Sequence, residues 1–290
     1  MTDRIAVLEV GGTHVTAAWV DRQGWLVSED YRADLAADGS AAELLDGLAA
    51  AGATLHAPAG TAWAVAMPGP FDYVDGIAHY TGVGKFEGLT GVDVRAELGP
   101  RLNAPGSINF VNDASAFLIG EWLIGTARGA TRCAAVTLGT GVGSAFLDRG
   151  RVVDTGPDVP PDAEVHLLSH AGRPLEDWVS RRAIRRAYAR SSGDDSGTDV
   201  KEIADRARAG DTHAAAAFEA AFQILGEVVA PWLTRFGADQ LVVGGSIAGA
   251  WDLIEGPLRS GLSRHPGTDL AVGLASEPER SPLVGTAYVG

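Results

Sequence analysis

The stretch Ile108-Asn109-Phe110-Val111-Asn112-Asp113-Ala114-Ser115-Ala116-Phe117 decides the fold of this chain. Its apolar first half predicts a buried strand, and the strand ends on Asn112-Asp113, where a helix is expected to begin. A carboxylate at the end of a strand is well placed to act as a catalytic base. The same pair could instead cap the helix, because Asn and Asp both accept hydrogen bonds from free backbone N–H groups. The residues alone leave both interpretations open.

Two glycine-rich turns could deliver a phosphate group to this acid: Gly11-Gly12-Thr13 and Gly139-Thr140-Gly141-Val142-Gly143. Glycines let the backbone approach an anion, and a threonine hydroxyl can donate to a phosphate oxygen. The second turn is not a Walker A motif, because no Gly-Lys-Ser/Thr follows, and it continues into a strand, unlike a Rossmann fingerprint. Each turn alone could be an ordinary hairpin turn. Two such turns at equivalent places in the chain predict a bound phosphate chain.

Composition bounds the class of protein. The chain has 290 residues, of which 46% are hydrophobic and 21% charged, as in globular proteins. Its net charge of -14 argues against binding to nucleic acid or to an anionic membrane surface. The single cysteine, Cys133, excludes a disulfide framework and a multi-cysteine zinc site. Because we find no signal peptide and no apolar run long enough to span a bilayer, we expect a cytoplasmic protein.

The pattern of elements predicts one topology used twice. In the first part, we expect strands at 4–10, 15–20, 25–31, 61–67 and 108–112, and helices at 41–51, 92–98 and 114–124. In the second part, we expect strands at 133–138, 143–148, 151–154, 240–243 and 270–274, and helices at 175–189, 200–209, 212–236, 248–262 and 282–288. Pro231 is expected to kink or split the longest helix. Residues 191–198 have the composition of a linker. The fold class is therefore α/β.

Three further groups of residues are candidates for a site. Gly244-Gly245-Ser246 follows a strand and could cap a helix or let an adenine ring lie on bare backbone. A loop with two acids and two histidines suits polyol hydroxyls, which need acceptors, although the histidines could also be metal ligands. Its members are Glu164, His166, His170 and Glu176. A cluster of arginines is more typical of a solvated or subunit-contact face than of a phosphate site. Its members are Arg181, Arg182, Arg185 and Arg186.

Taken together, these motifs resemble the ROK family of sugar kinases and repressors, within the actin-like ATPase and hexokinase superfamily. The resemblance covers nearly the whole chain, and the ordered set is far more specific than any one motif. The matching segments are Leu8-Glu9-Val10-Gly11-Gly12-Thr13, Ala66-Met67-Pro68-Gly69-Pro70-Phe71-Asp72, Val111-Asn112-Asp113-Ala114, Thr137-Leu138-Gly139-Thr140-Gly141-Val142-Gly143 and Val242-Val243-Gly244-Gly245-Ser246-Ile247.

The resemblance implies two actin-like (ribonuclease H-like) lobes with a central cleft that holds ATP and magnesium. The N-terminal lobe would comprise residues 1–113, joined by a C-terminal helix at 282–290, and the C-terminal lobe residues 114–281. The implied activity is ATP-dependent phosphorylation of a sugar hydroxyl, on a hexose or N-acetylhexosamine, as in glucokinases of carbohydrate metabolism. The family also suggests a homodimer.

The same resemblance assigns roles to individual residues. Asp113 would be the catalytic base, and Glu9 would face the magnesium ion through water. The sugar would be bound by Asn112, Gly69, Glu164, His166 and Glu176. ATP would be bound by Gly11, Gly12, Thr13, Gly139, Thr140, Gly141, Gly244, Gly245 and Ser246.

Four features depart from the family pattern. Glu9 stands where the family has Asp, and the extra methylene moves the carboxylate by about 1.5 Å. The cysteine-rich zinc loop is replaced by residues 171–176, so we expect no structural zinc. The loop that usually offers an Asn to the sugar is residues 80–86, with Gly82 nearest that place. His166 follows Glu164 one position early, which leaves His170 as the other candidate.

Other functions are also compatible with the family. A sugar-binding or regulatory protein that kept the fold and lost turnover is the main alternative, because of Glu9 and the missing zinc loop. A repressor would carry a helix-turn-helix before the first phosphate motif, where only residues 1–3 precede the first strand. A polyphosphate-dependent kinase would need a basic groove, which the sequence does not indicate, so ATP is the expected donor.

Overall fold

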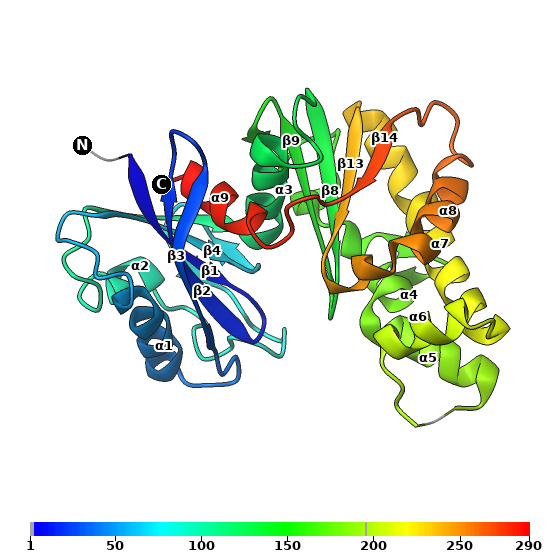
Figure 1. The fold of residues 1–290 in the computed structure, drawn as a ribbon, viewed down its shortest axis with the longest axis horizontal. Coiled ribbons are helices and arrows are strands. Elements are labelled where there is room, and N and C mark those ends of the chain that lie inside the picture. Colours follow the sequence, from blue (N-terminus) through cyan, green and yellow to red (C-terminus); the bar gives the residue numbers. More distant parts are fainter. Residues whose placement is uncertain (1–2, 195) are drawn as a thin grey trace. The chain divides into compact units, whose positions relative to one another are not determined.

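The computed structural model describes residues 3–194 and 196–290 of the chain (Figure 1). These residues form two compact units, 3–128 with 277–290, and 129–276 without residue 195. Each unit contains a five-stranded sheet covered by helices, which confirms the predicted α/β class. The division falls after Arg128, whereas the expected lobe boundary was at residue 113, because helix α3 (Asp113–Ile124) packs within the first unit.

The sheet of the first unit has the strand order β3-β2-β1-β4-β7. Its strands are β1 (Arg4–Val10), β2 (His14–Asp21), β3 (Leu26–Asp34), β4 (Ala62–Met67) and β7 (Ser107–Asn112). The first three strands pair antiparallel, whereas β4 is parallel to both β1 and β7. The carboxyl ends of these three parallel strands therefore meet at one edge of the sheet. At this edge lie the turn at Gly11, the turn at Gly69 and Asp113.

Successive side chains of β1 point to opposite faces of this sheet, and both faces are buried. Ala6 and Leu8 pack against the apolar face of α1 (Ala41–Ala53), which begins with a capping box of Ser40 and Glu43. Ile5 and Val7 pack instead against α9 (Ser281–Tyr288). The period-two alternation of a strand thus supplies both layers of the core. Three shorter elements complete the unit. They are β5 (Phe71–Asp72), β6 (Ile77–Ala78) and α2 (Val94–Leu98).

Helix α3 belongs to the first unit because it packs closely on α9. A Cβ atom on Gly120 would collide with the backbone of Ser281, and one on Gly285 would collide with that of Ala116. The buried carboxylate of Glu121 accepts hydrogen bonds from the Ser281 hydroxyl at 2.8 Å and from the Glu277 N–H at 3.1 Å. These contacts fix the helix that begins at Asp113 against the C-terminal segment.

The second unit repeats the strand order and directions of the first. Its sheet runs β10-β9-β8-β13-β14, with two antiparallel pairs followed by two parallel pairs. The strands are β8 (Arg132–Leu138), β9 (Val142–Asp148), β10 (Arg151–Val152), β13 (Gln240–Gly244) and β14 (Ala271–Leu274). A glycine-rich turn joins the first two strands of the unit, as it does in the first unit. The repeated topology predicted from the sequence is therefore present.

The helices of the second unit differ from the prediction at two places. They are α4 (Glu176–Val179), α5 (Arg181–Ser192), α6 (Val200–Arg208), α7 (Thr212–Phe236) and α8 (Trp251–Leu262), with 3-10 turns at Pro161–Ala163, Val165–Leu167 and Ser246–Ala250 and a hairpin of β11 (Ser169–His170) and β12 (Arg173–Pro174). The single helix expected at 175–189 was wrong, because Ser180 is extended and caps α5 through the N–H of Ala183. The helix expected from residue 248 is preceded by a 3-10 turn and begins at Trp251.

Helix α7 is the central helix of the second unit. Pro231 lies inside it and does not split it, contrary to one of the two expected outcomes. Among the described helices, α7 alone is long and apolar enough to cross a membrane by length and composition, although the sequence analysis had found no such run. Half of that apolar window is buried within the structure, where Phe218, Phe222 and Leu225 contribute to the core.

Candidate functional site

Asp113 is the first residue of α3 and lies directly after β7 at the carboxyl edge of the first sheet. Asn112 is the helix cap, since its Oδ1 atom accepts from the Ser115 N–H at 3.1 Å. The cap is therefore the neighbouring residue, and Asp113 is not needed for that role. The Asp113 carboxylate accepts a hydrogen bond from the Ala114 N–H at 2.8 Å, yet burial dominates and raises its pKa to about 6. Such a carboxylate is poised to exchange a proton near neutral pH.

The Asn112 side chain also joins a polar group that the sequence analysis did not identify. Its Nδ2 atom donates to the Tyr73 hydroxyl at 3.0 Å, and that hydroxyl donates to the Met67 carbonyl at 3.2 Å. A Cβ atom on Gly69 would lie 3.6 Å from the same hydroxyl. The structure thus brings Asn112 and Gly69 together around Tyr73. The signal for Tyr73 was an aromatic residue shortly after Pro68-Gly69-Pro70.

Glu9 lies one residue before the end of β1, at the same edge of the sheet as Asp113. Burial and the charge of Asp113 raise the pKa of Glu9 to about 7, although Arg32 and a hydrogen bond from Thr16 oppose the shift. The Nε2 atom of His14 lies 3.9 Å from the Glu9 carboxylate, whose side chain is 18% exposed. A carboxylate whose pKa is raised by burial and by a second acid lies where a cation is favoured. A carboxylate oxygen is also a ligand type that magnesium prefers, so Glu9 fits a metal-facing role.

The first glycine turn lies beneath two basic side chains. A Cβ atom on Gly11 would lie 2.7 Å from the His14 ring, and one on Gly12 would lie 2.5 Å from the Nζ atom of Lys85. Burial and the charge of Arg32 lower the pKa of His14. Side chains at either glycine would therefore fill space that His14 and Lys85 now occupy. The two basic side chains can approach the backbone of the turn because its residues are small.

The second glycine turn is held by residues from three other segments. The Gly139 carbonyl accepts from the Arg181 N–H at 2.9 Å, and the Val142 N–H donates to the Glu176 carboxylate at 3.3 Å. The Arg181 guanidinium donates to the Ser246 hydroxyl at 3.3 Å. The structure therefore brings the second turn together with Ser246, as the sequence analysis expected of one nucleotide site. Arg181, which the sequence grouped with a solvated face, is the link between them.

The acids and histidines proposed for the sugar do not form one group. Glu164 and His166 form a pair, with 3.9 Å between the carboxylate and the Nε2 atom. Glu176 lies instead at the second glycine turn. His170 packs edge-on against the Trp178 ring at 5.3 Å, and its carbonyl accepts from the Trp178 indole N–H. Its position favours His166 over His170 as the polar candidate, and the role of each in sugar binding stays a prediction.

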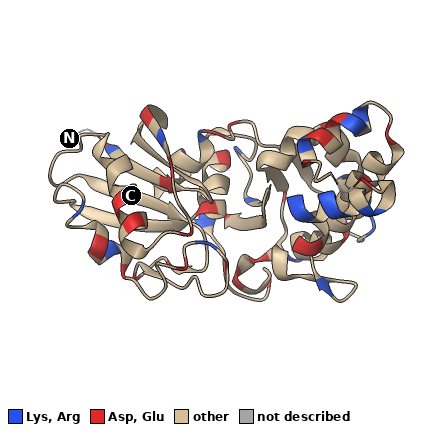
Figure 2. Cartoon of the chain, turned by 90° about the horizontal axis from the view of Figure 1, so that it is seen from below, with Lys and Arg blue, Asp and Glu red and all other residues tan. Residues whose placement is uncertain are grey.

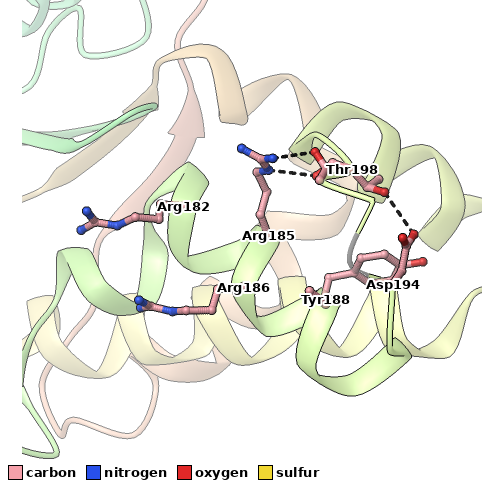
Figure 3. Close-up of a pocket in the computed structure, with 8 residues that line it drawn as sticks. Arg182, Arg185, Arg186, Tyr188, Asp194 and Thr198 are labelled. Atoms are coloured by element: carbon pink, nitrogen blue, oxygen red, sulfur yellow. Dashed lines mark hydrogen bonds between the residues drawn. The ribbon is translucent and has the colours of Figure 1, made fainter.

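The other three arginines of the cluster, Arg182, Arg185 and Arg186, line a cavity of about 230 Å³ (Figure 3). Arg185 points toward Thr198 and donates to its carbonyl at 3.0 Å, whereas Arg182 and Arg186 point away from it. Arg182 and Arg186 lie 3.6 and 4.0 Å from the carboxylate of Asp177. These guanidinium groups are thus engaged by the protein itself. Figure 2 shows that Lys and Arg residues are interspersed with Asp and Glu residues elsewhere in the chain.

The segment expected to be a linker, residues 191–198, is tied to α6 in its described part. Hydrogen bonds from Ser196, and then from the Arg206 guanidinium and the Thr198 hydroxyl, hold the pKa of the Asp194 carboxylate far below its usual range. Asp195 lies outside the described residues. Within residues 3–194 and 196–290, no group of three or more His, Cys, Asp or Glu side chains is arranged to hold a metal ion.

Fold and site together define an α/β protein in which two units of the same strand order each carry a glycine-rich turn between their first two strands. Residues 5–289 match the model of the ROK family, and the chain therefore belongs to this family. The family inferred from the sequence motifs is confirmed.

Comparison with individual proteins agrees with this assignment. The chain is 29% identical over 216 residues to a glucokinase of Thermotoga maritima, a match that covers 67% of each protein. Its fold matches that of the ROK hexokinase from Thermus thermophilus with a TM-score of 0.79 and 22% identity, over 99% of this chain and 97% of the other. It also matches a ROK family glucokinase from Streptomyces griseus, solved with glucose and AMPPNP, with a TM-score of 0.77 and 21% identity over 99% of each chain. These similarities show a fold shared with sugar kinases.

Proposed function

We propose that this protein transfers the terminal phosphoryl group of ATP to a hydroxyl group of a hexose or N-acetylhexosamine. The observation that carries the proposal is Asp113, a partly buried carboxylate at the carboxyl edge of the first sheet whose pKa burial raises to about 6. It is joined at that edge by a glycine turn and by the acid Glu9. Membership of a family whose matched relative is a glucokinase supports the same activity.

In the proposed reaction, the hydroxyl oxygen of the sugar forms a bond to the terminal phosphorus, and the bond from that phosphorus to ADP breaks. The proton of the hydroxyl passes to the Asp113 carboxylate. A base of this kind contributes roughly a hundred- to ten-thousandfold in rate. Asp113 is ionised above pH 6, so it can accept this proton under neutral conditions. The remaining acceleration is expected from positioning and electrostatic stabilisation.

The other predicted residues bind and orient the substrates in this proposal. Backbone N–H groups of the two glycine turns, with the hydroxyls of Thr13 and Thr140, hold the phosphates. The adenosine is proposed to lie on Gly244, Gly245 and Ser246. Asn112, Gly69, Glu164, His166 and Glu176 are proposed to accept or donate hydrogen bonds to the sugar. Magnesium, faced by Glu9 through water, would neutralise phosphate charge. A cytoplasmic homodimer without structural zinc remains part of the proposal.

The test of the activity is ADP release over a panel of hexoses and N-acetylhexosamines. The variant Asp113→Asn is expected to lose at least about a hundredfold in turnover on the best sugar. Asp30→Asn, at an exposed carboxylate of β3, is the matched control and should retain full activity. For the unmodified protein, kcat/KM should fall about tenfold per pH unit below pH 6, because the base must be ionised. Full turnover by the Asp113→Asn variant would show that the base is wrongly assigned.

A second candidate is a sugar-binding protein without turnover, and it rests on Glu9. This carboxylate is longer than Asp by one methylene, has a pKa of about 7 and lies beside His14. A misplaced metal-facing group of this kind can cost about a hundredfold in rate. Calorimetry distinguishes the two functions. Sugar binding without ADP release on any sugar of the panel would favour the binding protein.

A further inference from the structure

Lys85 provides a cationic group at the first glycine turn. The half-buried side chain ends over Gly12, where a Cβ atom would lie 2.5 Å from its Nζ atom. The chain has only two lysines, Lys85 and Lys201, and the second lies exposed on α6 in the other unit. Lys85 therefore differs from the many arginines of this protein, which form surface ion pairs.

The loop that carries Lys85 is fixed on the same segment as the turn. The Thr13 carbonyl accepts from the Leu35 N–H at 2.9 Å, and the Ala37 carbonyl accepts from the Phe86 N–H at 2.6 Å. Phe86 is buried directly after Lys85 and packs against the Tyr80 ring, with 5.5 Å between the ring centroids. The turn is thus bound to Leu35, and the loop of Lys85 is bound to Ala37, two residues further along the same segment. The position of the ammonium over Gly12 is a consequence of this backbone framework.

The ammonium group has no anionic partner among the residues that the structure describes. In the described residues, Lys85 forms neither a hydrogen bond nor an ion pair, and the nearby Glu87 carboxylate accepts instead from the Gly84 N–H at 2.9 Å. A cation held by its loop against a bare glycine turn, in a chain of net charge -14, attracts an anion. A lysine ammonium is a compact point charge that suits phosphate oxygens.

We infer that Lys85 binds the terminal phosphoryl group of the nucleotide at the first glycine turn. The inference rests on the proposed function and adds a residue that the motifs of the sequence did not assign. The terminal group is the part in question because the turn and Asp113 share one edge of the sheet, and the transferred phosphorus must come within reach of Asp113. Gly12 is required at this place because any side chain there would displace the ammonium group.

The test compares nucleotide binding by three variants, with AMPPNP and AMP as probes in calorimetry. Lys85→Met is expected to weaken AMPPNP binding about ten- to hundredfold, the effect of losing a charge-assisted hydrogen bond. AMP lacks the outer phosphates, so its affinity should not change. Lys85→Arg should restore most of the AMPPNP affinity, and the matched control Lys201→Met should behave as the unmodified protein.

Turnover provides the second readout. Lys85→Met should lower kcat and raise KM for ATP, while KM for the sugar stays unchanged. A loss confined to the sugar KM, an unchanged AMPPNP affinity, or no AMPPNP binding by the unmodified protein would each overturn the inference. Absence of ADP release by the unmodified protein, combined with a Lys85-dependent AMPPNP affinity, would instead refute the kinase activity and leave the phosphate site standing.

Discussion

The two glycine turns occupy equivalent places in the two units but face opposite charges. Each joins the first two strands of a sheet with the same order and directions. A Cβ atom on Gly12 would meet the ammonium group of Lys85, whereas one on Gly141 would meet the carboxylate of Glu176 at 2.9 Å. A phosphate is attracted by the first neighbour and repelled by the second. A repeated topology thus supplies two similar backbones and two different electrostatic environments.

The second unit has a close backbone contact beside its turn, although Gly139 and Gly141 within the turn meet only side chains. In the first unit, the glycines of the turn are close only to side-chain ends, which can move. In the second unit, Gly245 has a φ of 85° and its α-carbon faces the backbone of Leu138, at the end of the strand that leads into the turn. The segment beside the second turn therefore depends on a rigid backbone contact at Gly245, whereas the glycines of the turns themselves face side chains.

The largest effect is expected from Gly245→Ala. The new Cβ atom would collide with the Leu138 backbone and would occupy a left-handed conformation, so we expect a loss of about 3 kcal/mol in the free energy of unfolding. Gly139→Ala is the matched control, because its Cβ would lie 3.7 Å from the Ser246 hydroxyl, an ordinary contact. Urea denaturation measures both. Equal stability of the two variants would contradict the rigid contact at Gly245.

A smaller effect of opposite sign is expected from Glu9→Gln in the first unit. Because burial raises the folded-state pKa of Glu9 from 4.5 to about 7, ionising it opposes folding, and stability falls as pH rises through this range. The neutral variant should therefore be more stable than the unmodified protein by on the order of 2 kcal/mol at pH 8. The difference should vanish below about pH 4.5. Thermal unfolding across this pH range measures it, and a variant that is less stable at pH 8 would contradict the assignment.

Sequence patterns predicted the sheets better than the details of the site. Strands such as Arg4–Val10 and Ser107–Asn112 were predicted within one residue, because buried apolar runs are bounded by glycines or by polar caps. The break between α4 and α5 was missed, because the helical pattern continues through Ser180 while its hydroxyl caps a new helix. The 3-10 turn before α8 was also missed, because the sequence pattern does not distinguish a short 3-10 turn from the first turn of an α-helix.

Local motifs located the acids and glycines, but not the residues that reach them from other segments. Lys85, Tyr73 and Arg181 come within reach of these motifs through loops whose paths depend on the tertiary fold. The raised pKa of Glu9 depends on Asp113, which is 104 positions away in the chain and reaches it across the sheet. Such effects follow from strand order, which the motifs do not encode.

The smallest effect is expected from a substitution of Glu176, the carboxylate at the second turn. Glu176→Gln keeps an acceptor for the Val142 N–H and removes the negative charge, so stability should stay within about 0.5 kcal/mol. AMPPNP should then bind a few-fold tighter, because a partly exposed charge near the phosphates contributes about 1 kcal/mol or less. If Glu176 also accepts from the sugar, KM for the sugar should rise in the same variant.

Glu164→Gln is the control for this last variant. Glu164 pairs with His166 rather than with a glycine turn, so its substitution should raise KM for the sugar and leave AMPPNP affinity unchanged. If Glu176→Gln binds AMPPNP more tightly and has a higher KM for the sugar, the Glu176 carboxylate binds the sugar and repels the phosphates. Weaker AMPPNP binding by Glu176→Gln would show instead that the carboxylate organises the turn, and the electrostatic contrast between the two turns would then be wrong.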